Sequence, residues 1–302
     1  MFRYLFIYFI FFLSILRAEF NTTILDEYYD SLCQILVDSS NSVDDYFIDA
    51  NSSKRSKTEA ELKTSFAIES GKKSEYAMRL RLRISLPKIQ KKFRLIFEDE
   101  DSDDIFYDGT SLDNQYKVEQ KNYFLRLDFF NDVIKKLSLT TGVGVKFKKL
   151  NMYPYFNLKA RNMLDDKNAV VSNRFRLYNN GDFEDTLNLN KMKYFNDNIY
   201  FFYRNFFRYR SWTYNTSIVN SISATKILTD KQELTLGISL TSELEILKSY
   251  IRYRQLYVAY RDLLYKNWVY YEISPSMLWR EENGYERSYR FMFNIGINFK
   301  KY

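Results

Sequence analysis

The chain has 302 residues, with 45 Lys and Arg against 38 Asp and Glu, a formal net charge of +7 and no histidine. A single cysteine excludes an intrachain disulfide framework, and the lack of histidine excludes the common nucleophile–base pairs and histidine metal sites. Tyr and Phe number 27 and 26, against only 8 Gly and 3 Pro. The mild basic excess does not imply a nucleic acid, and we expect no nucleic-acid partner.

Residues 1–18, MFRYLFIYFIFFLSILRA, have the pattern of a signal peptide that is cleaved on export. Arg3 supplies the positive start, residues 4–16 supply the apolar run, and Ala18 suits the last position before cleavage. The apolar run is too short for a comfortable membrane span, although an uncleaved signal anchor remains the alternative.

Residues 19–56 are expected to form a periplasmic N-terminal helical segment. Within it, residues 24–37 place apolar side chains at helical spacing, which predicts a short amphipathic helix followed by a looser polar stretch. Three roles stay open for residues 24–49: a plug in a lumen, a helix on the periplasmic rim, or a recruitment site for a periplasmic partner.

From residue 57 to the end, apolar and polar residues alternate with a period of two. In SEYAMRLRLRISLP, residues 74–87, only a strand separates the apolar side chains from Arg79, Arg81 and Arg83. Strands are predicted near 57–69, 75–86, 91–98, 119–131, 135–148, 152–162, 169–179, 185–195, 199–210, 213–225, 232–242, 249–260, 267–279 and 286–300. Most are long enough to cross a bilayer at a tilt. The expected fold is all-β: a transmembrane antiparallel up-and-down β-barrel over 57–302, with about 12–14 strands.

The basic residues in these strands oppose apolar neighbours. A basic side chain facing lipid at the bilayer midplane costs about 2–4 kcal/mol, so these residues must face the lumen if the strands span. The predicted lumen-lining residues are Arg79, Arg81, Arg83, Arg126, Lys146, Lys159, Arg161, Arg174, Arg176, Arg204, Arg208 and Arg290. Lys191 and Lys193 share a phase with Leu187 and Leu189, which suggests a bulge or a misplaced boundary there.

The last strand, YRFMFNIGINFKKY, has Tyr289, Phe291, Phe293, Ile295, Ile297 and Phe299 in phase. With the signal peptide and the long strands, it resembles a porin-like Gram-negative outer-membrane β-barrel. The resemblance implies location in the bacterial outer membrane, contact with its lipid and lipopolysaccharide, and recognition of the terminal strand by the barrel-assembly machinery. A soluble secreted all-β protein, with sequons at 21–23 and 215–217, is the other fold considered.

We predict no enzyme, no cofactor and no metal site. Asp128 and Glu272 are isolated strand carboxylates better read as members of lumen ion pairs than as catalysts, and the acidic stretch 98–104 matches no Ca²⁺ loop spacing. The expected function is a passive channel or porin-like transporter whose basic lumen favours anionic solutes. The alternatives are a barrel closed by pairing with Glu69, Glu75, Asp128 and Glu272, and a non-transporting scaffold for surface or envelope interactions.

Overall fold

The computed structural model describes residues 22–47, 58–85, 93–98, 122–134, 137–148, 151–164, 168–246, 248–266 and 268–301. The predicted signal peptide 1–18, the sequon residue Asn21 and most of the acidic stretch 98–104 lie outside these residues. One helix, α2 (Thr22–Phe47), precedes the strands. The strands are β1 (Thr58–Glu69), β2 (Glu75–Ser85), β3 (Phe93–Glu98), β4 (Asn122–Ile134), β5 (Leu137–Lys148), β6 (Asn151–Leu164), β7 (Ala169–Tyr178), β8 (Phe183–Asn196), β9 (Ile199–Arg210), β10 (Asn215–Thr229), β11 (Gln232–Glu245), β12 (Lys248–Tyr265), β13 (Val269–Arg280) and β14 (Arg287–Lys301).

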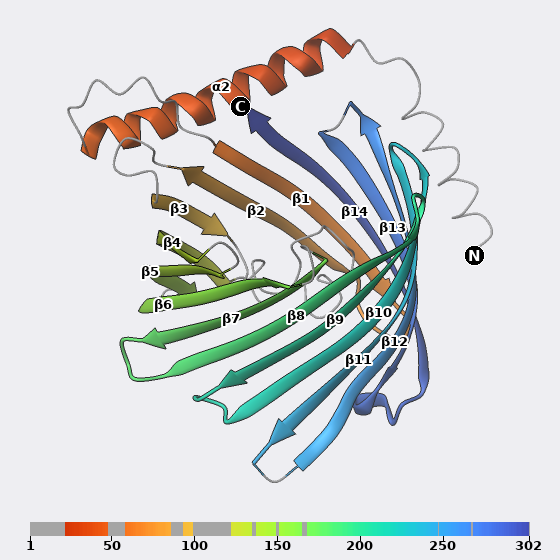
Figure 1. Cartoon of the computed structure of the whole chain (residues 1–302). Helices are drawn as coiled ribbons and strands as arrows, with labels where there is room; N and C mark the ends of the chain where they lie inside the picture. The colour runs from red at the N-terminus through yellow and green to blue at the C-terminus, as the bar shows by residue number, and fades with distance from the viewer. Residues whose placement is uncertain are drawn as a thin grey trace.

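The strands form one closed antiparallel barrel in which each strand pairs with its neighbours in sequence and β1 pairs with β14 (Figure 1). The predicted transmembrane-type barrel is therefore confirmed, with the strand number at fourteen. The short β3 and the irregularly patterned β8 are both members of the barrel, which rules out the count of twelve. We call the end where β1 begins and β14 ends the terminal mouth, and the opposite end the distal mouth.

Alternation of side chains divides the wall into an inner and an outer face. On β9, Phe202, Arg204 and Phe206 are buried, whereas Phe201 is 43% exposed and Tyr203 is 39% exposed. On β11, Thr235, Ser239 and Thr241 are buried, whereas Leu236 and Ile238 are about half exposed. Large apolar residues on the outside and polar residues inside are the arrangement of a barrel whose outer face meets hydrocarbon.

Strand β8 keeps its phase across Lys191 and Lys193, so the expected bulge or misplaced boundary is wrong. Its pairing with β9 is regular through Tyr194, and the register shifts only between Tyr194 and Asn196. Both lysines are exposed on the outer face, as Leu187 is. They lie near the end of β8, at the terminal mouth of the barrel. A lysine close to the membrane surface costs only about 0–1 kcal/mol, because its long stem lets the ammonium reach water.

Inward tyrosines pack against glycines on neighbouring strands. Gly237 pairs with Tyr257, and a Cβ on Gly237 would lie 2.3 Å from the Tyr257 hydroxyl oxygen. Gly296 pairs with Tyr270, where a Cβ would lie 2.3 Å from the ring. Both tyrosines are almost fully buried. The absence of a side chain at these glycines lets a large ring lie flat against the inner wall.

Helix α2 lies at the terminal mouth, next to the end of β14 (Figure 1). The helix continues to Phe47, ten residues beyond the predicted end at residue 37. The prediction of a looser stretch directly after residue 37 is therefore wrong for residues 38–47. No helix among the described residues is long and apolar enough to cross a membrane.

Candidate functional site in the barrel interior

The predicted basic residues lie on the inner phase of their strands. Five have less than 4% of their surface exposed: Arg126, Arg174, Arg176, Arg204 and Arg290. The others are half-buried: Arg79, Arg81, Arg83, Lys146, Lys159, Arg161 and Arg208. All except Arg290 belong to strands β2 to β9. We call this part of the inner wall the basic arc.

The basic arc contains cations on directly opposed positions. Lys159 of β6 pairs with Arg174 of β7, and both side chains have the inner phase. The same row continues through Thr186 of β8 to Arg208 of β9. A second like-charged pair joins Lys63 of β1, which lies just outside the basic arc, to Arg79 of β2. The register of the sheet thus places basic residues opposite one another on the inner wall.

Some arginines of the basic arc are held by carboxylates. Arg126 Nε lies 2.8 Å from Asp128 Oδ1, within a single strand. Glu184 accepts hydrogen bonds from Arg176 and Arg210, both at 3.2 Å, and joins β7 to β9. These contacts neutralise part of the positive charge and fix the guanidinium groups in place.

Arg290 belongs to a separate cluster at the distal mouth. Arg280 donates two hydrogen bonds of 2.9 Å to Glu69, and Arg290 donates one of 3.1 Å to the same carboxylate. Arg290 also donates to Glu75 at 2.8 Å, and Ser288 donates to Glu69 at 3.3 Å. We call this set the Glu69 cluster. It links β1, β2, β13 and β14 across the closure of the barrel, which makes Arg290 a residue of the closure.

Aromatic rings lie beside the arginines, and the sequence reasoning missed them. The guanidinium carbon of Arg208 is 5.0 Å from the ring centre of Phe206, and that of Arg204 is 5.4 Å from Phe202. Arg176 lies 5.0 Å from the ring of Phe124. In FFYRNFFR, residues 201–208, two phenylalanines share the phase of the arginines, so the signal was present. A ring face attracts a cation and holds its side chain against the wall.

Lys146 marks the distal part of the basic arc. Its ammonium lies 5.4 Å from the ring centres of Phe124 and Trp212 and 5.5 Å from that of Tyr178. It lines a cavity of about 240 Å³ together with Lys148, Asn180 and Asp182. The rings on three sides attract the ammonium group and hold the Lys146 side chain against the wall.

The remaining strands, from β10 around to β1, present a different inner surface. Buried Ser and Thr side chains are frequent there, among them Ser221, Ser223, Thr225, Thr235, Ser239, Thr241, Ser274 and Ser276. We call this part of the wall the hydroxyl arc. It also carries Glu272, which accepts a hydrogen bond of 2.9 Å from Asn294.

The isolated carboxylates named from the sequence lie apart in the wall. Asp128 sits in β4 beside Arg126, and Glu272 sits in β13 beside Asn294. Within the described residues, no group of His, Cys, Asp and Glu side chains has the arrangement of a metal site.

Helix α2 is fastened to the terminal mouth by a few contacts. The Tyr29 ring stacks on Trp268 at 4.4 Å and on Phe299 at 5.7 Å, and its hydroxyl donates to the Asn298 carbonyl oxygen. Asp26 accepts hydrogen bonds from Lys266 at 2.8 Å and from the Tyr265 hydroxyl at 2.9 Å.

The bond from Lys266 lowers the pKa of Asp26 and raises the pKa of Lys266. Beside these contacts is a cavity of about 650 Å³, whose charged lining residues are Glu59, Glu61, Arg81, Arg83 and Lys266. The helix therefore borders a charged space at the entrance to the barrel.

Comparisons with known proteins bear on the fold. No family model matches the chain, and no curated protein matches it in sequence. Among solved structures, in-vitro folded OmpT, an outer-membrane protein of Vibrio cholerae, has 9% identity and a TM-score of 0.49, with 82% of this chain and 100% of that chain covered. The outer-membrane channel DcaP of Acinetobacter baumannii has 9% identity and a TM-score of 0.48, with 81% and 96% covered.

A third similar structure is the KdgM porin in complex with disordered oligogalacturonate, with 12% identity, a TM-score of 0.38, and 78% and 98% covered. The neighbours of this closed fourteen-stranded antiparallel barrel are thus outer-membrane channels and porins.

Proposed function

We propose that this porin-like barrel is a passive channel of the outer membrane that favours anionic solutes and performs no chemistry. The observation that supports this most directly is the pairing of Lys159 with Arg174 on the inner wall. Opposed cations on an inner wall favour the entry of an anionic solute.

The two arcs support different roles in the passage of a solute. The basic arc, on β2 to β9, attracts the negative groups of a solute. The hydroxyl arc, on β10 around to β1, adds the hydroxyl groups of Ser and Thr, which can form hydrogen bonds with a polar solute. A site that attracts on one side and binds weakly on the other lets a solute enter and also leave, which conduction requires.

The test is charge reversal on β2. Arg79, Arg81 and Arg83 are changed together to Glu, and the reversal potential of the reconstituted protein is measured under a KCl gradient. We expect a shift toward cation selectivity. Lys191, Lys193 and Lys226, which are exposed on the outer face, provide the matched control when changed together to Glu. Unaltered selectivity in the Arg79/Arg81/Arg83 variant, or equal shifts in both variants, would contradict an anion path along the basic arc.

We further propose that α2 acts as a plug or cap at the terminal mouth. The helix contains Asp26, Glu27, Asp30, Asp38, Asp44 and Asp45 and no basic residue, so it is opposite in charge to the basic arc. Deletion of residues 24–49 is expected to raise single-channel conductance. Currents that stay the same would leave α2 as a helix on the rim only.

The second candidate for α2 is recruitment of a periplasmic partner. Tyr28, Leu32 and Ile35 lie three and four residues apart and are 67%, 47% and 58% exposed, which gives the helix an apolar outer stripe. The expected discriminating result is that changing Leu32 and Ile35 to Ser leaves conductance unchanged, whereas deletion of the helix raises it. If the serine variant alone raises conductance, the stripe serves the plug.

The proposal includes insertion of the barrel in the bacterial outer membrane. Residues 1–18 direct export and are removed, lipopolysaccharide and phospholipid surround the wall, and the assembly machinery binds β14.

The second candidate function is a non-transporting scaffold, favoured by the carboxylates that hold Arg126, Arg176 and Arg290. Absence of current from folded, heat-modifiable protein in a planar bilayer would select the scaffold.

A further inference from the structure

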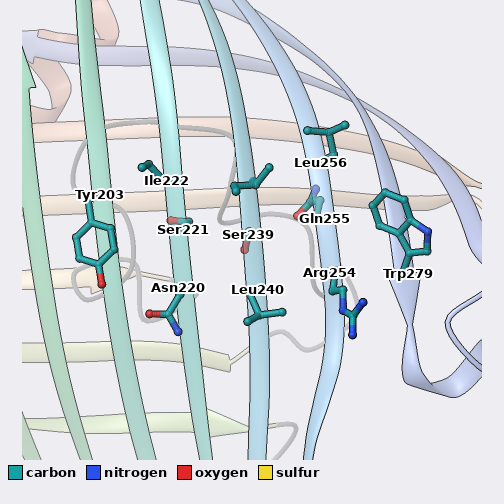
Figure 2. A pocket seen from close by; sticks show the side chains of 11 residues that line it. Tyr203, Asn220, Ser221, Ile222, Ser239, Leu240, Arg254, Gln255, Leu256 and Trp279 are labelled. Atoms are coloured by element: carbon teal, nitrogen blue, oxygen red, sulfur yellow. The ribbon is translucent and has the colours of Figure 1, made fainter. Parts of the chain in front are cut away.

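A groove of about 680 Å³ runs across the outer face of β9 to β13 (Figure 2). Its apolar lining residues include Ile222, Ile238, Leu240 and Leu256. Tyr203 and Trp279 stand at its two ends. Ile222 and Ile238 are 46% and 54% exposed, so these side chains are open to the surroundings of the barrel. A largely apolar, outward-facing groove of this volume can hold part of an acyl chain.

Two arginines face outward where the groove meets the distal mouth. Arg254 has the phase of Leu256, which is 39% exposed, and Arg287 has the phase of Tyr289, which is 51% exposed. In the sheet, Arg254 pairs with Trp279, and Trp279 pairs with Arg287. The two arginines are therefore two strand spacings apart, a backbone separation of about 10 Å, on either side of one indole ring.

The place of Trp279 in β13 shows where the two arginines lie along the barrel axis. Trp279 is the last residue but one of β13, and the hairpin that follows it belongs to the distal mouth. The guanidinium groups lie 5.4 Å from the rings of Tyr285 and Tyr289. Tyrosine and tryptophan gather where a membrane protein crosses from hydrocarbon into the headgroup layer. We infer from these rings that Arg254 and Arg287 lie at the level of the lipid headgroups. Arg254 lines the groove, and Arg287 lies one strand beyond Trp279, at the end of the groove.

The groove also contains a polar contact in its lipid-facing wall. Asn205 and Asn220 pair across β9 and β10, and the Asn205 amide donates to the Asn220 side-chain oxygen at 2.5 Å. Asn220 lines the groove on the same cross-strand row as Leu240 and Arg254. An amide in this position can meet the ester groups that join an acyl chain to its headgroup.

We propose that this groove is a binding site for a membrane lipid with an anionic phosphate headgroup. Arg254 and Arg287 hold the phosphate, and the chain lies over Ile222, Ile238, Leu240 and Leu256. The charge complementarity decides the occupant, because two guanidinium groups on either side of Trp279, at the end of an apolar groove, fit a phosphate attached to a hydrocarbon chain. The site is separate from the barrel interior and does not depend on conduction.

Native mass spectrometry of the full chain, released from detergent with added lipid, tests the site. The probes are phosphatidylglycerol and phosphatidylcholine with identical acyl chains. We expect phosphatidylglycerol to be retained more strongly by the unmodified protein. Changing both Arg254 and Arg287 to Gln should lower that retention at least tenfold, because the loss of even one hydrogen bond to a charged group corresponds to about a tenfold change.

Two variants separate a built site from general attraction to anionic lipid. Lys226→Gln removes an exposed outer cation near the terminal mouth and should leave retention unchanged. Ile238→Trp fills the groove while keeping both arginines, and it should lower retention of phosphatidylglycerol. Equal retention of both lipids, an arginine double variant that retains as much as the original, or an Ile238→Trp variant with full retention would overturn the proposal. A second copy of the chain appearing in place of lipid would do the same.

Discussion

Lys159 and Arg174 occupy directly opposed positions on β6 and β7, with both cationic side chains on the inner wall of the barrel. Next to them on the outer face are Leu158, which is 36% exposed, and Phe175, which pairs with it. At this level of the wall the cations lie on the inside and apolar residues lie on the outside.

Replacing Lys159 with Gln should weaken the selectivity of the channel, because it removes one of two opposed cations from the inner wall. The change should move the reversal potential in a KCl gradient toward zero, as measured by bilayer recording. Urea unfolding in detergent checks that the variant barrel is folded. A folded variant that is as selective as the original would contradict the role given to this pair.

Removing the carboxylate of the Glu69 cluster is expected to destabilise the barrel. Glu69→Ala leaves Arg280 and Arg290 without the carboxylate that holds them, and breaking a buried ion pair costs about 3–5 kcal/mol. We expect a lower urea midpoint and loss of the heat-modifiable band at a lower temperature. Glu282→Gln is the control, because Glu282 is exposed and its pair with Lys72 should contribute less than about 1 kcal/mol. Equal effects of the two changes would show that the cluster does not hold the closure.

The close approach of Tyr257 to Gly237 predicts a steric effect. Gly237→Ala forces a methyl group into the ring, since the added carbon would lie 2.3 Å from the hydroxyl oxygen. We expect a loss of about 1–3 kcal/mol in unfolding free energy. Combining it with Tyr257→Ala should cost less than the sum of the two single changes. Strict additivity in this double-mutant cycle would mean that the two residues do not constrain each other.

Docking of α2 should depend on pH through Asp26. Lys266 lowers the pKa of Asp26, so their bond contributes at a pH above the ordinary aspartate range and is lost as pH falls through the lowered pKa. We expect amide hydrogen exchange in residues 22–47, corrected for intrinsic rates, to be faster below about pH 4 than at pH 7. In Asp26→Asn this acid-dependent part should shrink. An identical pH response in the variant would assign the change to other groups.

The buried Cys33 offers a second measure of α2 docking. In Tyr29→Ala, the stacking on Trp268 is lost, and the helix should separate more readily from the rim. We expect faster reaction of Cys33 with a thiol reagent at pH 7, with Tyr28→Ala as the exposed control. If Cys33 reacts in both variants at the rate of the unmodified protein, Tyr29 does not anchor the helix.

The sequence predicted the fold well because a strand's period of two is visible in a single chain. In residues 75–85 the alternation of arginine with leucine gave both the strand and its two faces. It predicted β8 poorly, because Lys191 and Lys193 are outward residues whose tolerance depends on their depth in the membrane. Depth is a property of the assembled barrel and is not written in the local pattern.

The sequence predicted which side chains face the interior of the barrel. It did not predict which residues those side chains contact. Arg290 was named as lumen-lining, yet its contacts with Glu69 and Glu75 exist only because β14 closes against β1. The same closure brings Arg280 to Glu69 across more than two hundred residues of sequence. The outward row of Arg254, Trp279 and Arg287 likewise depends on the register of three strands.

Bilayer recording of the unmodified protein under a chloride gradient tests the central claim most directly. A channel that uses the basic arc should give a reversal potential of the sign set by chloride, with conductance that falls when Arg174 and Arg204 are changed to Gln. A reversal potential of the sign set by potassium, from protein whose barrel is folded, would contradict the account.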